Sequence, residues 1–341
     1  MKNLAFFYPE NHEKHFQQGH PERPGRVETI NTALSTSSLW SNFQPLPPEP
    51  MPDDLLFAVH NPDYIKKLNQ ACIQGSSLDM DTYTTSDSWN LAIQTAGGAL
   101  AVAHAVWSAS HTCGFALTRP PGHHATRERG MGFCLLNNIA LAAESLISAY
   151  GAERIAIVDI DLHHGNGTQD IFWERPDVLY ISSHQYPHYP GSGRLSESGH
   201  GLGESATLNI PLPSGSGDQA FSAMTEAVIL PMLERFQPEM LLVSAGFDVH
   251  WRDPLGSLEV SASGYGQTVG KLSQWCDQHC QGRIALFLEG GYDLEAGAAC
   301  ALASSSALLG KDFTDPLGVS PYPESSDWMG ILEQVKQFWQ F

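Results

Sequence analysis

Side chains that commonly bind metal ions follow two apolar segments of this sequence. Asp161 and His163 stand two residues apart directly after the run Arg154–Asp159. Asp248 follows the run Met240–Ala245. Residues two apart on a strand point to the same side, so one imidazole and two carboxylates can surround one divalent ion. Such a set leaves positions open for water and substrate, as catalytic sites do. Its nitrogen and oxygen donors suit zinc, but iron(II), cobalt or manganese would also fit.

A histidine pair and a tyrosine could supply the remaining chemistry of a hydrolase. His123 and His124 follow Pro-Pro-Gly, where a helix is disfavoured, so both can face one ligand-filled space. Amide hydrolysis needs a base for water and an acid for the leaving amine, and imidazole suits both tasks. We expect Asp159 and Asn166 to hold the two rings, with Asp raising the basicity of its histidine and neutral Asn perturbing the other less. Tyr292 follows two glycines, and its hydroxyl can stabilise an oxyanion.

Each of these residues also has an ordinary structural interpretation. An Asp at a strand end is commonly a helix cap or turn residue, and a lone His is commonly a satisfied polar group. The convergence of Asp248 and the histidine pair on the Asp161 segment favours the catalytic interpretation. Cys276, His279 and Cys280 fit a helix with partly buried thiols better than a second metal site.

Buried strands that alternate with helices must position these residues. Apolar, β-branched runs predict strands at Cys113–Thr118, Arg154–Asp159, Val178–Ser182, Met240–Ala245 and Ile284–Glu289. Helical spacing occurs at about 88–110, 136–150, 219–236, 264–280 and 295–309. The pattern predicts an α/β fold with three αβα layers around a mainly parallel sheet, in which ligands bind beyond the carboxyl ends of the strands. We expect a single domain over residues 1–341, with the Pro-rich segment Pro45–Pro52 as a surface loop.

Composition and charge exclude several classes of function. With 42% hydrophobic and 16% charged residues the chain is an ordinary globular protein. The net charge of −19 disfavours nucleic acid and anionic lipid as partners. No apolar stretch reaches the roughly 20 residues of a membrane span, and the first residues lack a signal-peptide core. Six cysteines without framework spacing suit a reducing compartment, so we expect a cytoplasmic protein that binds neither nucleic acid nor a membrane.

Seven motifs in the same order resemble the histone deacetylase family of the arginase-deacetylase fold. The resemblance is strongest to its class II and bacterial amidohydrolase-like members. The motifs span nearly the whole chain: HPERPGR (20–26), RPPGHHA (119–125), GFCLLNN (132–138), DIDLHHGNGTQ (159–169), SSHQYPHYPGSG (182–193), SAGFDVHWRDPLG (244–256) and LEGGYDL (288–294).

The resemblance implies hydrolysis of an N-acyl amide, typically of an acetylated lysine side chain, to an amine and acetate at one zinc ion. It implies that His124 is the base, His123 the electrostatic or acid partner and Tyr292 the transition-state donor. The metal ligands that it implies are Asp161, His163 and Asp248. A narrow tunnel for the acyl-lysine would be lined by Gly132, Phe133, Tyr189 and Leu255. Arg26 matches an arginine near an internal acetate channel, and the positions that match a structural potassium site are Asp159, Asp161, His163 and Ser182.

Two positions refine the class and the substrate. Asn166 stands where class I members have Asp, which agrees with class II. Leu255 stands where polyamine deacetylases of the family carry a glutamate, and leucine cannot pair with a remote ammonium group. We therefore prefer acyl-lysine in peptides or proteins, or small acylated amines, over acetylpolyamines.

Three alternatives stay open at this point: a deacetylase of acetylpolyamines or other small N-acyl amines, a two-manganese ureohydrolase like arginase, and a non-catalytic acyl-lysine-binding module. A ureohydrolase needs further bridging ligands, and the presence of His124 and Tyr292 argues against a silent module. The sequence leaves the physiological substrate, the acyl-chain preference, the native metal and the oligomeric state open.

Overall fold

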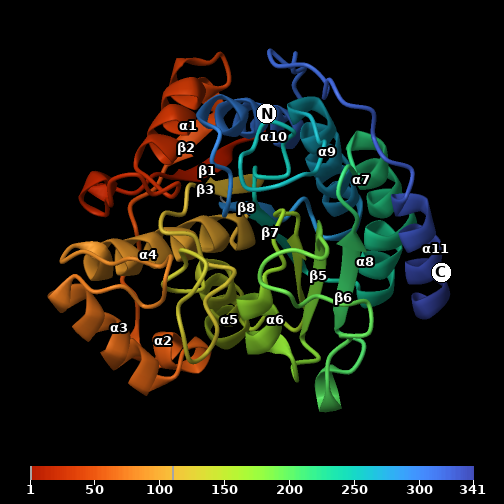
Figure 1. The fold of residues 1–341 in the computed structure, drawn as a ribbon. Helices are drawn as coiled ribbons and strands as arrows, with labels where there is room; N and C mark the ends of the chain where they lie inside the picture. The colour runs from red at the N-terminus through yellow and green to blue at the C-terminus, as the bar shows by residue number, and fades with distance from the viewer. Residues whose placement is uncertain (1, 110) are drawn as a thin grey trace.

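Parallel strands form one central sheet in the computed structural model, which describes residues 2–109 and 111–341 (Figure 1). The sheet has eight strands in the spatial order β2-β1-β3-β8-β7-β4-β5-β6. Every neighbouring pair of these strands is parallel, so the expectation of a mainly parallel sheet is confirmed. The strands are β1 (Leu4–Phe7), β2 (Phe43–Pro45), β3 (Cys113–Ala116), β4 (Ile155–Asp159), β5 (Val178–Gln185), β6 (Thr207–Leu212), β7 (Met240–Ala245) and β8 (Ile284–Leu288).

Helices cover both faces of the sheet, which gives the three predicted layers (Figure 1). The helices on one face are α2 (Asp53–Val59), α3 (Pro62–Gln74), α4 (Ser88–Trp107), α5 (Asn138–Tyr150) and α6 (Asn166–Phe172). The helices on the other face are α1 (Gly25–Thr36), α7 (Asp218–Met224), α8 (Leu230–Phe236), α9 (Ala262–His279), α10 (Leu294–Leu309) and α11 (Trp328–Trp339). None of the described helices is long and apolar enough to cross a membrane.

Alternate residues of each central strand pack into two separate cores. On β4, Ala156 and Val158 belong to the core beneath α1, α9 and α10, whereas Ile155 and Ile157 belong to the core beneath α4 and α5. Both sets are fully buried. Because helices cover both faces of the sheet, these four positions of the strand are all apolar, although successive side chains point to opposite faces.

The five predicted strands are the contiguous centre of the sheet, and the strands that the sequence did not predict lie toward its two sides. The edge strand β6 contains Asn209 and Pro211, which weaken a strand pattern. Proline is tolerated there because an edge strand has one side without a ladder partner. The apolar run of β1 is only four residues long, and it is a strand because it pairs with β3 from Leu4↔Cys113 onward.

The predicted helices agree with α4, α5, α9 and α10 to within a few residues. The predicted helix 219–236 is divided by a π-helical turn, Thr225–Ile229, between α7 and α8. Pro231 lies at the start of α8 just after this turn, and proline lacks the N–H that would continue the hydrogen bonds of one long helix. The loop Pro45–Pro52 lies largely at the surface, as expected, and the backbone N–H of Glu49 donates to the carbonyl of Gly97 on α4 at 3.0 Å.

Candidate active site

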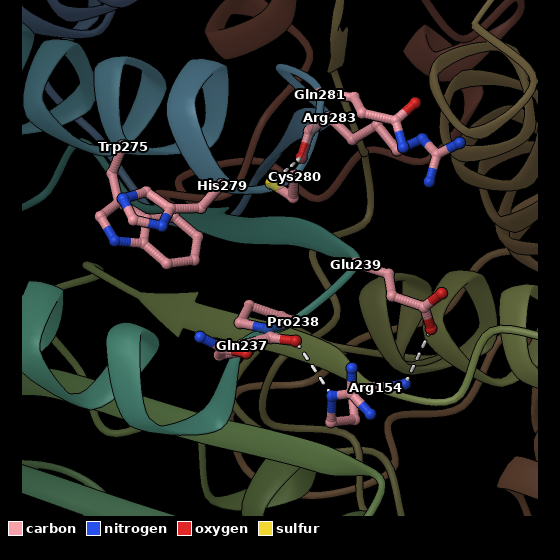
Figure 2. A pocket seen from close by; sticks show the side chains of 9 residues that line it. All are labelled: Arg154, Gln237, Pro238, Glu239, Trp275, His279, Cys280, Gln281 and Arg283. Atoms are coloured by element: carbon pink, nitrogen blue, oxygen red, sulfur yellow. Dashed lines mark hydrogen bonds between the residues drawn. The ribbon is translucent and has the colours of Figure 1, made fainter.

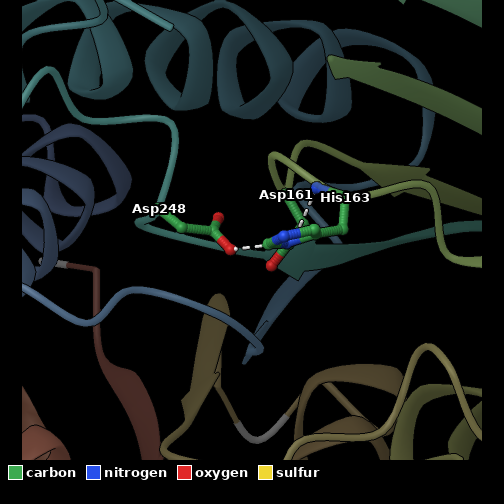
Figure 3. Close-up of side chains that lie close together, drawn as sticks. All are labelled: Asp161, His163 and Asp248. Carbon is green, nitrogen blue, oxygen red and sulfur yellow. Dashed lines mark hydrogen bonds and ion pairs between the residues drawn. The ribbon is translucent and has the colours of Figure 1, made fainter. Parts of the chain in front are cut away.

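The structure brings Asp161, His163 and Asp248 together beyond the carboxyl ends of β4 and β7 (Figure 3). All three residues are buried, and their donor atoms lie within 4.8 Å of one another. Nδ1 of His163 lies 3.0 Å from Oδ2 of Asp248 and 3.2 Å from Oδ1 of Asp161. Ligand atoms at about 2.0–2.2 Å from a tetrahedral zinc ion are roughly 3.4 Å apart. The cluster therefore fits a single ion of that kind.

Two glycines let the backbone approach the carboxylates of this cluster. A Cβ atom at Gly246 would overlap Oδ2 of Asp161, and one at Gly290 would overlap Oδ2 of Asp248. The backbone N–H of Gly290 instead donates to Oδ2 of Asp161 at 2.8 Å. The backbone N–H of Leu162 donates to Oδ1 of Asp248 at 3.0 Å. These hydrogen bonds fix the orientation of each carboxylate and leave its other oxygen directed into the cluster.

The paired histidines lie beside the cluster with the partners that the sequence predicted for them. Nδ1 of His123 lies 3.0 Å from Oδ2 of Asp159, and Nδ1 of His124 lies 2.8 Å from Oδ1 of Asn166. The ring centroids of His123 and His124 are 4.1 Å apart. The hydroxyl of Tyr180 also donates to Oδ2 of Asp159, at 3.0 Å. Because each Nδ1 is engaged, Nε2 is the nitrogen that each ring offers to a substrate or water, and Nε2 of His123 lies 3.8 Å from Oδ1 of Asp161.

The two histidines have opposite pKa shifts. Burial lowers the pKa of His123, but the carboxylates of Asp161 and Asp159 outweigh it and raise this pKa to about 10. Burial, together with the charges of His123 and His163, lowers the pKa of His124 well below its usual value. The histidine that pairs with Asp159 is therefore the one whose pKa is raised, as expected for an Asp partner. The neutral Asn166 perturbs its histidine little, as expected of an amide partner, and the pKa of His124 falls mainly because the ring is buried and then because two imidazole rings flank it.

Tyr292 lies at the same site, and a buried arginine packs against its ring. The guanidinium carbon of Arg26 is 4.7 Å from the ring centroid of Tyr292. Nε of Arg26 donates to the carbonyl of Gly291 at 2.6 Å, and Nη2 donates to the carbonyl of Glu289. Arg26 thus holds the glycine turn that precedes Tyr292, at the position where the resemblance implies an acetate channel. Gly291 has φ +111°, which only glycine adopts readily.

A narrow cavity of about 230 Å³ connects these groups to the surface. It is lined by all four residues expected in the tunnel, Gly132, Phe133, Tyr189 and Leu255, and by His124, His163, Tyr292 and Asp81. The ring of Phe133 stands edge-on to that of Tyr292 at 5.7 Å, and the ring of Tyr189 stands edge-on to that of His124 at 5.1 Å. A Cβ atom at Gly132 would overlap the ring of His124, so this position has no room for a side chain.

Sequence reasoning missed Asp81, the acidic residue among those that line the cavity. Burial and the neighbouring Asp79 raise its pKa. Asp81 lies in the loop between α3 and α4, far from any strand end, so its position in the sequence gave no signal.

The positions that match a potassium site lie close together, since Ser182 is the register partner of Asp159 on β5. The backbone N–H of Asp161 donates to Oδ1 of Asp159 at 3.2 Å.

A second cavity, of about 250 Å³, lies at the amino ends of the central strands, opposite the ends that carry the metal-ligand candidates (Figure 2). Its lining includes Arg154, Glu239 and Arg283, which directly precede β4, β7 and β8. His279 and Cys280 also line it, and the ring of His279 stacks on Trp275 with centroids 4.6 Å apart. The one cluster of three metal-binding side chains among residues 2–109 and 111–341 is that of Asp161. The interpretation of Cys276 and Cys280 as buried thiols therefore agrees with the structure.

Comparison with known proteins gives a consistent set of relatives. Residues 20–308 match the sequence pattern of the histone deacetylase domain. The chain is 38% identical over 321 residues to the chloroplastic histone deacetylase 14 of Arabidopsis thaliana, covering 87% of this chain and 75% of that protein. It is 34% identical over 294 residues to a histone deacetylase-like amidohydrolase of Pseudomonas aeruginosa, covering 86% and 77%. The crystal structure of the HDA15 HD domain is similar with a TM-score of 0.90 at 34% identity, covering 99% of this chain and 94% of that one.

Proposed function

The chain belongs to the histone deacetylase family, and from this premise we propose that it is a zinc-dependent hydrolase of N-acyl amides. Its substrate would be acetyl-lysine in a peptide or protein, and its products a free amine and acetate. The observation that carries the proposal is the buried cluster of Asp161, His163 and Asp248 beside the histidine pair, with one member of each group, His163 and His124, lining the same cavity as Tyr292.

Asp161, His163 and Asp248 would hold the zinc ion. The donor set of one imidazole and two carboxylates, with donor atoms within 4.8 Å of one another, supports this assignment. When bound, the ion supplies Lewis acidity toward water and toward the amide carbonyl.

His124 would act as the general base. Nδ2 of Asn166 donates to Sδ of Met131 at 3.5 Å, which directs the amide oxygen of Asn166 toward His124. Nδ1 of His124 therefore donates to that oxygen, and Nε2 keeps its lone pair to accept a proton from water. The lowered pKa of His124 keeps the free ring neutral, so its Nε2 is unprotonated before the reaction.

His123 would carry positive charge beside this base. Its raised pKa favours the imidazolium, whose Nδ1–H donates to Asp159. A cation at this position stabilises negative charge on the substrate and holds a proton for the leaving amine. The hydroxyl of Tyr292 would donate to the carbonyl oxygen as charge develops there. The aromatic rings of Phe133 and Tyr189 offer apolar faces to the lysine stem.

We make the remaining assignments of the family on the same basis. Asp159, Asp161, His163 and Ser182 would surround a potassium ion, and Arg26 would lie on the path of acetate. The whole chain would act as one catalytic domain. Six buried free cysteines support a reducing compartment such as the cytoplasm.

The test is a zinc-loaded sample assayed against acetyl-lysine peptides, longer acyl-lysine peptides and acetylpolyamines, with metal content measured in parallel. Turnover of acyl-lysine peptides at one zinc per chain supports the proposal. Turnover of acetylspermidine far above that of any peptide would replace the substrate with a small amine. Binding of acetyl-lysine without turnover would make the chain a binding module, and two metal ions per chain would favour a ureohydrolase.

A further inference from the structure

Asp253 is a buried carboxylate to which the chemistry above assigns no part. Its Oδ2 accepts hydrogen bonds from the backbone N–H groups of Tyr292 at 2.6 Å and of Asp293 at 3.2 Å. Its Oδ1 accepts a hydrogen bond from the backbone N–H of Leu255 at 3.0 Å. One carboxylate thus joins the chain segment of the tunnel residue Leu255 to that of the oxyanion donor Tyr292.

Leu255 is also held at its carbonyl group. Nε2 of His188 lies 3.0 Å from this carbonyl oxygen, so it donates its hydrogen there. The ring of His188 stacks on the metal-ligand candidate His163 with centroids 5.2 Å apart. The peptide groups on both sides of Leu255 are therefore fixed, one by Asp253 and the other by His188. Leu255 and Tyr292 line the same cavity, so their spacing sets part of its width.

The carboxylate of Asp253 is costly to bury, and the described residues provide no cation for it. The adjacent Arg252 pairs with Asp293 at 3.4 Å and with Glu295 at 2.7 Å. Burial and the charge of Asp248 raise the pKa of Asp253 to about 7, and the three N–H groups oppose this rise. Burying a charge that only N–H groups compensate costs free energy of folding, so a function in the site explains its presence better than a gain in stability.

We propose that Asp253 is a positioning residue that couples the Leu255 wall of the cavity to the alignment of the Tyr292 hydroxyl. The coupling rests on the proposed function, because it assumes that Tyr292 is the oxyanion donor. Loss of this carboxylate would let the two segments move apart. Turnover would then fall, and the cavity would accept longer acyl chains.

The chain contains a matched control for this residue. Asp315-Pro316-Leu317-Gly318 repeats the four residues of Asp253-Pro254-Leu255-Gly256. Oδ1 of Asp315 accepts from the backbone N–H of Leu317 at 2.9 Å, as Oδ1 of Asp253 does from Leu255. Oδ2 of Asp315 accepts from the backbone N–H of Ser263 at 2.9 Å, near the start of α9. Asp315 does not line the cavity.

The experiment compares Asp253→Asn and Asp315→Asn with wild type. For each protein we would measure kcat, KM and zinc content. We would also measure the butyryl ratio, which is kcat/KM for a butyryl-lysine peptide divided by kcat/KM for an acetyl-lysine peptide. Asparagine keeps the volume but replaces one acceptor oxygen by a donor. Because misplacement by about 1 Å can cost 10²-fold, we expect kcat per bound zinc to fall about 10- to 100-fold in Asp253→Asn. The butyryl ratio should rise, whereas Asp315→Asn should stay within about twofold of wild type in both measures.

A double-mutant cycle separates positioning from general damage. In a Tyr292→Phe background, Asp253→Asn should lower kcat little further, because the group that it aligns is already absent. If Asp253→Asn does not fold, His188→Phe keeps the ring stacked and removes only the Leu255 hydrogen bond. That variant should raise the butyryl ratio.

Each outcome decides one question. Wild-type kcat per zinc and a wild-type butyryl ratio in Asp253→Asn would overturn the proposal. When Asp253→Asn does not fold, a wild-type butyryl ratio in His188→Phe would overturn it. So would equal losses in Asp253→Asn and Asp315→Asn. The wild-type rate tests the proposed function separately, and the comparison of variants is made on whichever N-acyl amine the wild type hydrolyses.

Discussion

Replacing Tyr292 by phenylalanine removes one hydroxyl and leaves the packing of the ring in place. The ring stands edge-on to Phe133 at 5.7 Å and lies against Arg26 at 4.7 Å, and phenylalanine can keep both contacts. Within the described part of the chain the Tyr292 hydroxyl makes no hydrogen bond to protein. We therefore expect the free energy of unfolding to change by no more than about 0.5 kcal/mol.

The effect on catalysis should be much larger than the effect on stability. Removal of one oxyanion donor typically costs about 10²- to 10³-fold in kcat, or roughly 2.7–4 kcal/mol of transition-state stabilisation. The hydroxyl acts mainly on charge that develops during attack, so KM should stay nearly constant and kcat/KM should fall together with kcat. Zinc content should be unchanged, because no ligand atom is removed.

The assay follows acetate release from an acetyl-lysine peptide, with zinc content and thermal unfolding measured on the same samples. Tyr265→Phe is the control, because the buried hydroxyl of Tyr265 has no hydrogen-bond partner among the described residues. It should keep the wild-type kcat. A Tyr292→Phe enzyme within about threefold of the wild-type kcat would refute the oxyanion role.

Three further predictions follow from individual side chains. Glu289→Ala leaves the backbone N–H groups of Gly122 and His123 without their acceptor and should lower the free energy of unfolding by about 2–6 kcal/mol in denaturant titrations. Glu289→Gln keeps an acceptor oxygen and should fold normally, and equal stabilities of the two variants would contradict this. Burial lowers the pKa of His60 from 6.5 to about 4, so its protonation favours the unfolded chain. The contribution of His60 to the free energy of unfolding should therefore fall by up to about 3 kcal/mol from pH 6.5 to 4, so His60→Phe should lose less stability than wild type over this range in denaturant titrations. Equal losses in the two proteins would contradict this. Leu255→Glu should raise the ratio of kcat/KM for acetylspermidine over that for an acetyl-lysine peptide roughly tenfold. This corresponds to about 1.4 kcal/mol for a new ion pair between the glutamate and the remote ammonium group of the polyamine. An unchanged ratio would show that Leu255 does not select the substrate.

The sequence predicted the centre of the fold better than its margins. The apolar runs of β4, β7 and β8 stand out because helices cover both faces of these strands. At the edge of the sheet, Asn209 on β6 is compatible with a strand because its amide donates to Oε1 of Gln169 at 2.8 Å and to the carbonyl of Glu197 at 3.1 Å. Such tertiary partners are invisible to a pattern of hydrophobicity.

The candidate site was predictable where it depends on strand ends and less so where it depends on loops. Asp161 and Asp248 follow neighbouring parallel strands, so the topology alone brings them to one edge. Asp81 and Asp253 lie on loops whose paths are set by packing and by hydrogen bonds to distant backbone. The strong lowering of the His124 pKa likewise depends first on burial and then on how closely three imidazole rings assemble, and spacing along the chain encodes neither.

The proposed hydrolysis of the acyl amide requires one divalent cation, which Asp161, His163 and Asp248 would hold. The most direct measurement is a titration of metal-stripped protein with Zn²⁺ while acetate release from an acetyl-lysine peptide is followed. We expect no activity before zinc is added, recovery that saturates at one equivalent per chain, and neither binding nor recovery in Asp248→Ala. Full activity in the stripped protein, or an Asp248→Ala variant with wild-type zinc content and activity, would contradict it.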